Sequence, residues 1–213
     1  MKLQEQLQEM LKHLLALGYD TEELVFAPPA SFNEIQILER TFGFSLPPSF
    51  RDTLLNISSH VEFRWFSPQD TEFPEPFGSN FSGNIHWSIR SLKSFNDKKD
   101  EWIEKVFPDP NNSYDLVWHN KLAFYEVGNG DYLAIDLNPS KYEQIVYLSH
   151  DDGEGHGHVL AEDFQALLTR WAPLAFTGGE DWQWLPFTND LTSYIDPNCK
   201  NAKVWREVLK IAT

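Results

Sequence analysis

The chain has 213 residues, with 17 lysines and arginines against 32 aspartates and glutamates, for a formal net charge of −15. This balance excludes the basic face of a nucleic-acid binder and argues against an anionic membrane surface, and no apolar run approaches the ~18 residues of a membrane span. A chain of this length buries ~70% of its unfolded surface, and the single cysteine, Cys199, favours the reducing cytoplasm, so we expect one domain over 1–213.

Three helices are predicted in the first sixty residues. One apolar stripe predicts a helix over 2–17, with Leu3, Leu7, Leu11, Leu14 and Leu15 on its face. Ser31 and Glu34 have the spacing of a capping box, so a second helix should begin there and end at Gly43. Pro47 and Pro48 favour the start of a third helix, which should form a hairpin with the second.

Strand patterns follow. Period-two alternation in HVEFRWF predicts a strand over 60–66, and the Pro- and Gly-rich stretch 67–83 predicts a loop outside the core. GNIHWSIRSL fits either a strand or the entry to a helix, and 97–107 fits a short helix. Four short antiparallel strands are then expected at 115–118, 122–127, 131–137 and 144–148, with a turn at Gly128–Asn129–Gly130.

The remaining elements complete an α+β pattern. A helix is predicted over 161–171, and another near 202–211 within the Trp-rich C-terminal extension 172–213. Helices, then a run of neighbouring strands, then helices indicate an α+β fold in which helices pack an antiparallel β-sheet.

The densest polar cluster is SHDDGEGHGH, residues 149–158. Its His150, Asp152, His156 and His158 are of the types that ligate zinc, but no second ligand group has a recognised spacing, and a polar glycine-rich hairpin is the simpler explanation of the cluster. Nucleophile elbows, phosphate loops and dinucleotide fingerprints are absent. We therefore predict a protein that is not an enzyme, with no catalytic residue, metal or cofactor. Asp136, between apolar neighbours, should be partly buried and hydrogen-bonded.

Acidic charge concentrates in one segment. Residues 121–163 contain nine acids against Lys121 and Lys141, a net charge of −7. The segment either keeps the chain in solution or attracts a basic partner. Trp182 and Trp184 flank Gln183, and alternation would place both on one strand face, either in the core or as partner anchors. The predicted partner-binding residues are Asp131, Asp151, Asp152, Glu154, Trp182 and Trp184.

Three stretches together resemble a known family. They are PASFNEIQILERTFGFSLPPSFRDTLL (29–55), VGNGDYLAIDL (127–137) and VYLSHDDGEGHGHVLAEDFQALL (146–168). Their order and spacing resemble the SUKH superfamily, the Smi/Knr-like domains, over residues 29–171. The first helix, the 67–83 loop and the extension after 172 match less well.

The resemblance implies a Smi/Knr-like α+β fold without a shared catalytic centre. For bacterial members it implies immunity against a polymorphic toxin, and for fungal members a regulatory scaffold linked to cell-wall synthesis. The leading hypothesis is an immunity protein that binds a basic toxin, for example a nuclease. The alternatives are a scaffold of the same fold and a metal-dependent hydrolase using residues 150–158. The oligomeric state stays open.

Overall fold

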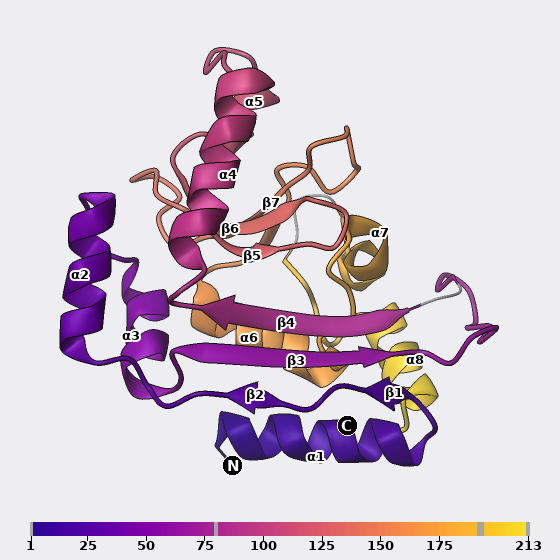
Figure 1. Ribbon diagram of the computed structural model, residues 1–213. Coiled ribbons are helices and arrows are strands. Elements are labelled where there is room, and N and C mark those ends of the chain that lie inside the picture. The colour runs from indigo at the N-terminus through magenta and orange to yellow at the C-terminus, as the bar shows by residue number, and fades with distance from the viewer. Residues whose placement is uncertain (1, 79–80, 191–193, 212–213) are drawn as a thin grey trace.

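A computed structural model describes residues 2–78, 81–190 and 194–211 (Figure 1). The α-helices are α1 (Leu3–Ala16), α2 (Phe32–Phe42), α3 (Pro48–Asn56), α4 (Leu92–Lys105), α5 (Asp115–Trp118), α6 (Phe164–Trp171), α7 (Asp181–Trp184) and α8 (Lys200–Val208). Two short 3₁₀ helices, η1 (Ala172–Leu174) and η2 (Leu185–Phe187), directly follow α6 and α7. The strands are β1 (Asp20–Thr21), β2 (Val25–Phe26), β3 (His60–Phe66), β4 (Ser82–Ser88), β5 (Lys121–Glu126), β6 (Tyr132–Asp136), β7 (Ile145–Leu148) and β8 (Val159–Ala161). The chain therefore has the α+β fold that its order of elements predicts.

The helix starts follow the signals in the sequence. The Ser31 N–H donates to Glu34 Oε2 at 2.8 Å, and the Glu34 N–H donates to Ser31 Oγ at 3.3 Å, which is the predicted capping box of α2. Gly43 ends α2 with a positive φ of 76°, a conformation that glycine adopts without steric cost. Pro48 occupies the first turn of α3, where the proline ring stabilises a helix start.

The first sheet is centred on β3. This strand pairs antiparallel with β4 along one edge and with the short β1 and β2 along the other. Val61, Phe63 and Trp65 are fully buried, as the period-two pattern predicts. GNIHWSIRSL forms β4 and then a turn into α4, which begins at Leu92, five residues before the predicted start.

The second sheet has the order β5-β6-β7-β8, and every neighbouring pair is antiparallel. The predicted turn at 128–130 joins β5 to β6, with Gly130 at a φ of 99°. The prediction of a strand over 115–118 is wrong, because these residues form the short helix α5, whose Trp118 is buried. A four-residue apolar run does not distinguish a strand from a helical turn by periodicity.

Helices cover both faces of the second sheet, so its strands are buried on both sides. The Phe107, Trp118 and Tyr132 side chains form a small core under α4 and α5. The larger core joins residues from Leu7 in α1 to Leu209 just after α8. None of the described helices is both long enough and apolar enough to cross a bilayer.

The C-terminal extension lies along the free edge of β4. The Asn84 N–H donates to the Phe176 carbonyl at 2.9 Å, and the Gly178 N–H donates to the Ser82 carbonyl at 3.0 Å. Gly83 and Gly178 form a parallel bridge between these contacts. Segment 175–178 therefore extends the first sheet by a short stretch of backbone pairing.

The segment 67–83 is not the excursion outside the core that its prolines predict. Phe77 is 3% exposed and Phe81 is 1% exposed, and both rings pack against the buried Trp205 of α8 at centroid distances of 4.9 and 5.0 Å. These aromatic side chains pack the segment against the C-terminal extension, and its last two residues, Ser82 and Gly83, already belong to β4.

The buried environment of His86 in β4 predicts how the stability of the fold depends on pH. Burial lowers the pKa of this imidazole from its usual 6.5 to about 4, and the ring stacks on Tyr125 at 4.2 Å. At pH values between these two pKa values, His86 is protonated in the unfolded chain but not in the folded chain, so lowering the pH favours unfolding. The free energy of unfolding should fall by about 1 kcal/mol between pH 7.5 and pH 5.5 through this group.

Urea denaturation of the wild type and of a His86→Phe variant at the two pH values measures this contribution. The variant keeps an aromatic ring against Tyr125 but has no titratable group. An identical loss of stability in both proteins would show that His86 does not carry the effect.

Candidate functional site

The loop 149–158 connects β7 to β8 and stands above α7 in Figure 1. Its first anchor is Asp131, at the start of β6. Asp131 Oδ1 accepts hydrogen bonds from the N–H of His150 at 2.9 Å and from its Nδ1 at 2.6 Å. Asp131 Oδ2 accepts a third bond from the Tyr147 hydroxyl at 2.6 Å. Burial and this bond raise the pKa of Tyr147, so its hydroxyl remains a donor.

Asp131 is 1% exposed, which corrects its prediction as a partner-binding residue. A carboxylate this deep in the molecule cannot touch a partner without disrupting the loop above it. Its role is to hold the loop, because it satisfies backbone and side-chain donors that burial would otherwise leave unpaired.

The second anchor is Tyr114, just before α5. Its hydroxyl donates to the Ser149 carbonyl at 3.0 Å and accepts from the Asp152 N–H at 3.0 Å. The ring stacks on His156 at 3.7 Å. His156 Nδ1 accepts the Ser149 N–H at 3.1 Å, and burial lowers the pKa of His156, so the neutral ring donates from Nε2 to the Tyr114 carbonyl.

The third anchor is α7. Asp181 Oδ2 accepts the Gly155 N–H at 2.9 Å, and Trp184 packs beneath the loop with no exposed surface. The prediction that Trp182 and Trp184 share one strand face is therefore wrong. On the helical turn of α7, Trp184 points into the core, whereas Trp182 is 43% exposed. Trp184 supports the site from below and does not reach a partner.

Gly155 gives a direct test of this contact. A Cβ at this position would lie 2.5 Å from the Cβ of Asp181 and 2.7 Å from Cζ2 of Trp184. Gly155→Ala should therefore push the loop away from α7 and lower the free energy of unfolding by about 1–3 kcal/mol. Chemical denaturation measures the loss.

Gly128→Ala is the matched control, because a Cβ there meets nothing within 4 Å. Its stability should stay close to that of the wild type. If the two variants were equally stable, the loop would not be held against α7 in the way described.

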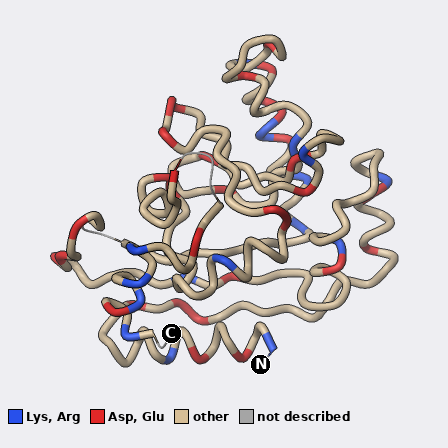
Figure 2. The backbone as a smooth tube through the Cα atoms, turned by 180° about the vertical axis from the view of Figure 1, so that it is seen from behind, with Lys and Arg blue, Asp and Glu red and all other residues tan. Residues whose placement is uncertain are grey.

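The outer surface of the loop and of α7 carries acids around one aromatic ring. Asp152, Glu154, Asp181 and Trp182 line a hollow of about 480 Å³ whose floor contains Gly153, Leu185 and Pro186. We call this set of four, together with the neighbouring Asp151, the acidic–aromatic surface. Red segments mark its acids on the loop and on α7 in Figure 2.

The geometry of this surface is fixed, and its charges are uncompensated. Trp182 Nε1 donates to Glu180 Oε2 at 2.8 Å, and its ring meets Phe81 edge-on at 5.4 Å. Asp151 Oδ1 accepts from the Ser149 hydroxyl at 2.9 Å. Among the described residues, none of the ion pairs involves an acid of the acidic–aromatic surface. The arrangement can therefore receive a cationic group from outside.

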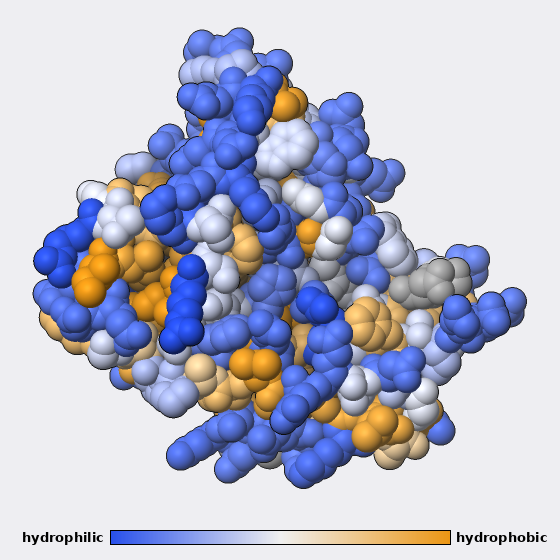
Figure 3. Space-filling view, viewed as in Figure 1, coloured by the Kyte–Doolittle hydropathy of each residue, from blue (hydrophilic) through white to orange (hydrophobic). Residues whose placement is uncertain are grey.

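A second exposed feature is apolar. Figure 3 shows a hydrophobic patch on the side of the molecule where α2 and α3 lie. Phe32, Ile37 and Phe44 in and next to α2 are 58%, 50% and 37% exposed. These three side chains are uncharged.

The histidines and acids that the sequence grouped as possible metal ligands do not all lie together. In the described residues, the group with metal-ligand geometry is Asp131, His150 and Asp151, whose ligand atoms lie within 4.8 Å of one another. Asp152, His156 and His158 are not part of it. Asp131 Oδ1 is already occupied by two hydrogen bonds from His150. Of the four residues that the hydrolase alternative uses, only His150 therefore belongs to this group.

Asp136 is buried and hydrogen-bonded, as expected from its apolar neighbours. It is 2% exposed, accepts the N–H and side-chain amide of Asn138 at 2.8 and 2.7 Å, and lies 3.2 Å from the Lys121 ammonium. Burial lowers the pKa of Lys121, whereas Asp136 opposes that shift. The pair closes the end of the β5–β6 hairpin and is structural.

Sequence reasoning did not find Asp181 or Tyr114, and both help to form the site. The acids in GGEDWQW lie next to Trp182 and were a usable signal for Asp181. No local pattern marks Tyr114, which reaches the loop from 35 residues away in the chain.

Comparison with known proteins gives one family. The family described as SMI1 / KNR4 family (SUKH-1) matches residues 29–170, which include α2 through most of α6 and the whole 149–158 loop. No curated protein matches the chain.

Proposed function

This chain belongs to the SMI1/KNR4 family (SUKH-1), and on that premise we propose that it is an immunity protein that binds and neutralises a basic toxin. Domains of this family are known for toxin immunity and are generally not catalytic. The net charge of −15 supports a basic partner, because opposite charge accelerates encounter. A nuclease-type toxin fits best, since a surface that holds phosphates is basic.

The observation that carries the proposal is the acidic–aromatic surface. An arginine or lysine side chain of the toxin can enter the hollow, pair with Asp152, Glu154 or Asp181 and stack on Trp182. The chain offers these carboxylates no cation of its own among the described residues. A toxin side chain would supply the missing charge.

The anchoring of the loop supports the same assignment. Hydrogen bonds to Asp131, Tyr114 and Asp181 hold the loop from three elements, so little conformational freedom is lost when a partner binds. Binding loops on a rigid framework are a common arrangement in protein recognition.

If this gene lies beside a toxin gene, as an immunity gene should, the function is tested in cells that produce that toxin. The chain should restore growth and form a stable complex with that toxin, measured by calorimetry. Growth arrest that the chain does not relieve, with no complex at micromolar concentrations, would contradict the proposed function.

Trp182→Ala tests the site within that experiment. The variant should weaken the complex at least tenfold, because an exposed ring at the centre of an interface is a frequent hot spot. Tyr142→Ala is the matched control, since Tyr142 is 44% exposed on another part of the surface. If the two variants had equal affinities for the toxin, the interface would not include Trp182, but the immunity function would not be contradicted.

A further inference from the structure

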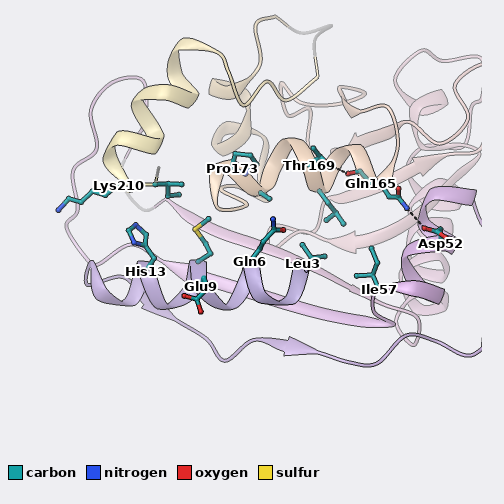
Figure 4. Close-up of a pocket in the computed structure, with 14 residues that line it drawn as sticks. Leu3, Gln6, Glu9, His13, Asp52, Ile57, Gln165, Thr169, Pro173 and Lys210 are labelled. Atoms are coloured by element: carbon teal, nitrogen blue, oxygen red, sulfur yellow. Dashed lines mark hydrogen bonds between the residues drawn. The ribbon is translucent and has the colours of Figure 1, made fainter. Parts of the chain in front are cut away.

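A groove lies between α1 and α6 (Figure 4). Its volume is about 1040 Å³, at the upper end of the ~300–1,000 Å³ of small-molecule sites. Leu3, Met10, Ile57, Leu168, Pro173 and Ile211 give it an apolar wall. The groove is thus separate from the acidic–aromatic surface.

The residues that line each of the two long walls of the groove are spaced along the sequence as on one face of a helix. From α1 the groove receives Leu3, Gln6, Met10 and His13, and from α6 and η1 it receives Gln165, Leu168, Thr169 and Ala172. Residues three and four apart lie on one face of a helix, and such rows are what one helix presents to another. Leu7, Leu11 and Leu14, on the neighbouring side of α1, are buried in the core. In the groove-facing row Leu3 and Met10 are only partly buried, Gln6 is exposed, and the His13 ring donates from Nε2 to the Leu209 carbonyl at 2.8 Å. The row therefore keeps exposed surface toward the groove.

The two ends of the groove differ in charge. Asp52 lies at one end, where its carboxylate accepts from Gln165 Nε2 at 2.9 Å, and Lys210 and His13 lie at the other (Figure 4). Glu9, in the middle of α1, also lines the groove, and its carboxylate pairs with Lys12 at 2.8 Å. None of the ion pairs in the described part of the chain involves Lys210. An acid at one end and a base at the other complement a ligand with the reverse polarity.

A helix has that polarity. Its aligned peptide groups place about +0.5 charge at the N-terminus and about −0.5 at the C-terminus. We propose that the groove binds an amphipathic helix of a partner protein, with its apolar face between α1 and α6, its N-terminus at Asp52 and its C-terminus at Lys210. Both α1 and Lys210 lie outside residues 29–170, so the groove depends on parts of the chain beyond the family match. The proposal is independent of the toxin site.

Two synthetic 16-residue peptides test the binding and its direction. Both carry leucines with helical spacing on one face and have the same composition. The first has two lysines in its first turn and two glutamates in its last, and the second has these charges exchanged. At low salt the first should bind the full chain about fivefold more tightly, measured by fluorescence anisotropy. Acids near a helix N-terminus favour helix formation, so helicity alone would favour the second peptide.

Variants of the chain assign the binding to the groove. Met10→Glu should weaken binding of the first peptide at least tenfold, whereas Gln8→Glu, on the outward face of the same helix, should leave it unchanged. Thr169 is exposed on α6 and lines the groove, so Thr169→Trp should fill the groove without disturbing the core. This variant should also weaken binding, and it tests the proposal if Met10→Glu does not fold. Asp52→Lys combined with Lys210→Glu should reverse the preference between the two peptides.

Several outcomes would overturn the proposal. One is that neither peptide binds, and another is that the charge exchange leaves the preference unchanged. A dimer seen by light scattering that Met10→Glu abolishes would assign the groove to a second copy of this chain. Binding of palmitate that depends on Met10, without peptide binding, would assign it to an acyl chain.

Discussion

Replacing Asp151, Asp152 and Glu154 together with lysine is expected to slow association with the toxin by roughly tenfold or more at low salt. These acids lie in a loop whose backbone is held in place, so the substitution changes the field at the proposed interface more than it changes the fold. Above ~0.15 M salt the screening length falls to ~8 Å, and the effect should shrink. Dissociation should change less, unless a toxin arginine is buried against one of the carboxylates, in which case ~2–5 kcal/mol is lost.

Stopped-flow association at several salt concentrations measures both effects. The matched control is the triple replacement of Asp20, Glu22 and Glu23 by lysine, which changes the net charge equally at the short strand β1. A control that slows association as much as the loop variant would assign the effect to net charge. An unchanged rate and salt slope in the loop variant would contradict the placement of the interface.

Asp131→Ala is expected to lower the free energy of unfolding by about 1–3 kcal/mol, the cost of leaving buried hydrogen-bond donors without a partner. The substitution leaves the buried Tyr147 hydroxyl and the His150 N–H without their acceptor, in a place where water does not replace it. The loop should also become mobile, so affinity for the toxin should fall although Asp131 does not touch it.

Chemical denaturation measures the stability of this variant, and amide hydrogen exchange of residues 149–158 measures the mobility of the loop. Glu154→Ala is the control, because it removes an exposed acid from the same loop. It should leave both stability and exchange near wild type. A stable Asp131→Ala variant with a protected loop would show that other contacts are sufficient to hold it.

Local signals predicted the elements whose causes are local. The capping box at Ser31 and Glu34 fixed the start of α2, and alternation around Phe63 identified β3, because each depends on neighbours a few residues away. The strands of the second sheet are buried on both faces, so alternation was absent there, and the turn at 128–130 was the more informative signal.

The candidate site was only partly predictable, because burial depends on distant contacts. Asp131 and Asp152 look alike in the sequence, yet Tyr147 and His150 surround the first and solvent surrounds the second. Trp184 is buried and Trp182 is exposed because the segment forms the helix α7, in which two residues spaced by two do not lie on the same face. The count of charges identified the acidic segment 121–163, but which of its acids face the solvent depends on tertiary contacts.

The pairing of segment 175–178 with β4 has a consequence for synthesis on the ribosome. Until this segment has emerged, β4 presents unpaired N–H and C=O groups along one edge, which is the kind of edge that recruits other chains. The aromatic rings of Phe77 and Phe81 also stay uncovered until Trp205 has been synthesised and can pack against them. A nascent chain that stalls or is cut before the last quarter should therefore aggregate, because neither the edge of β4 nor these rings would yet be covered.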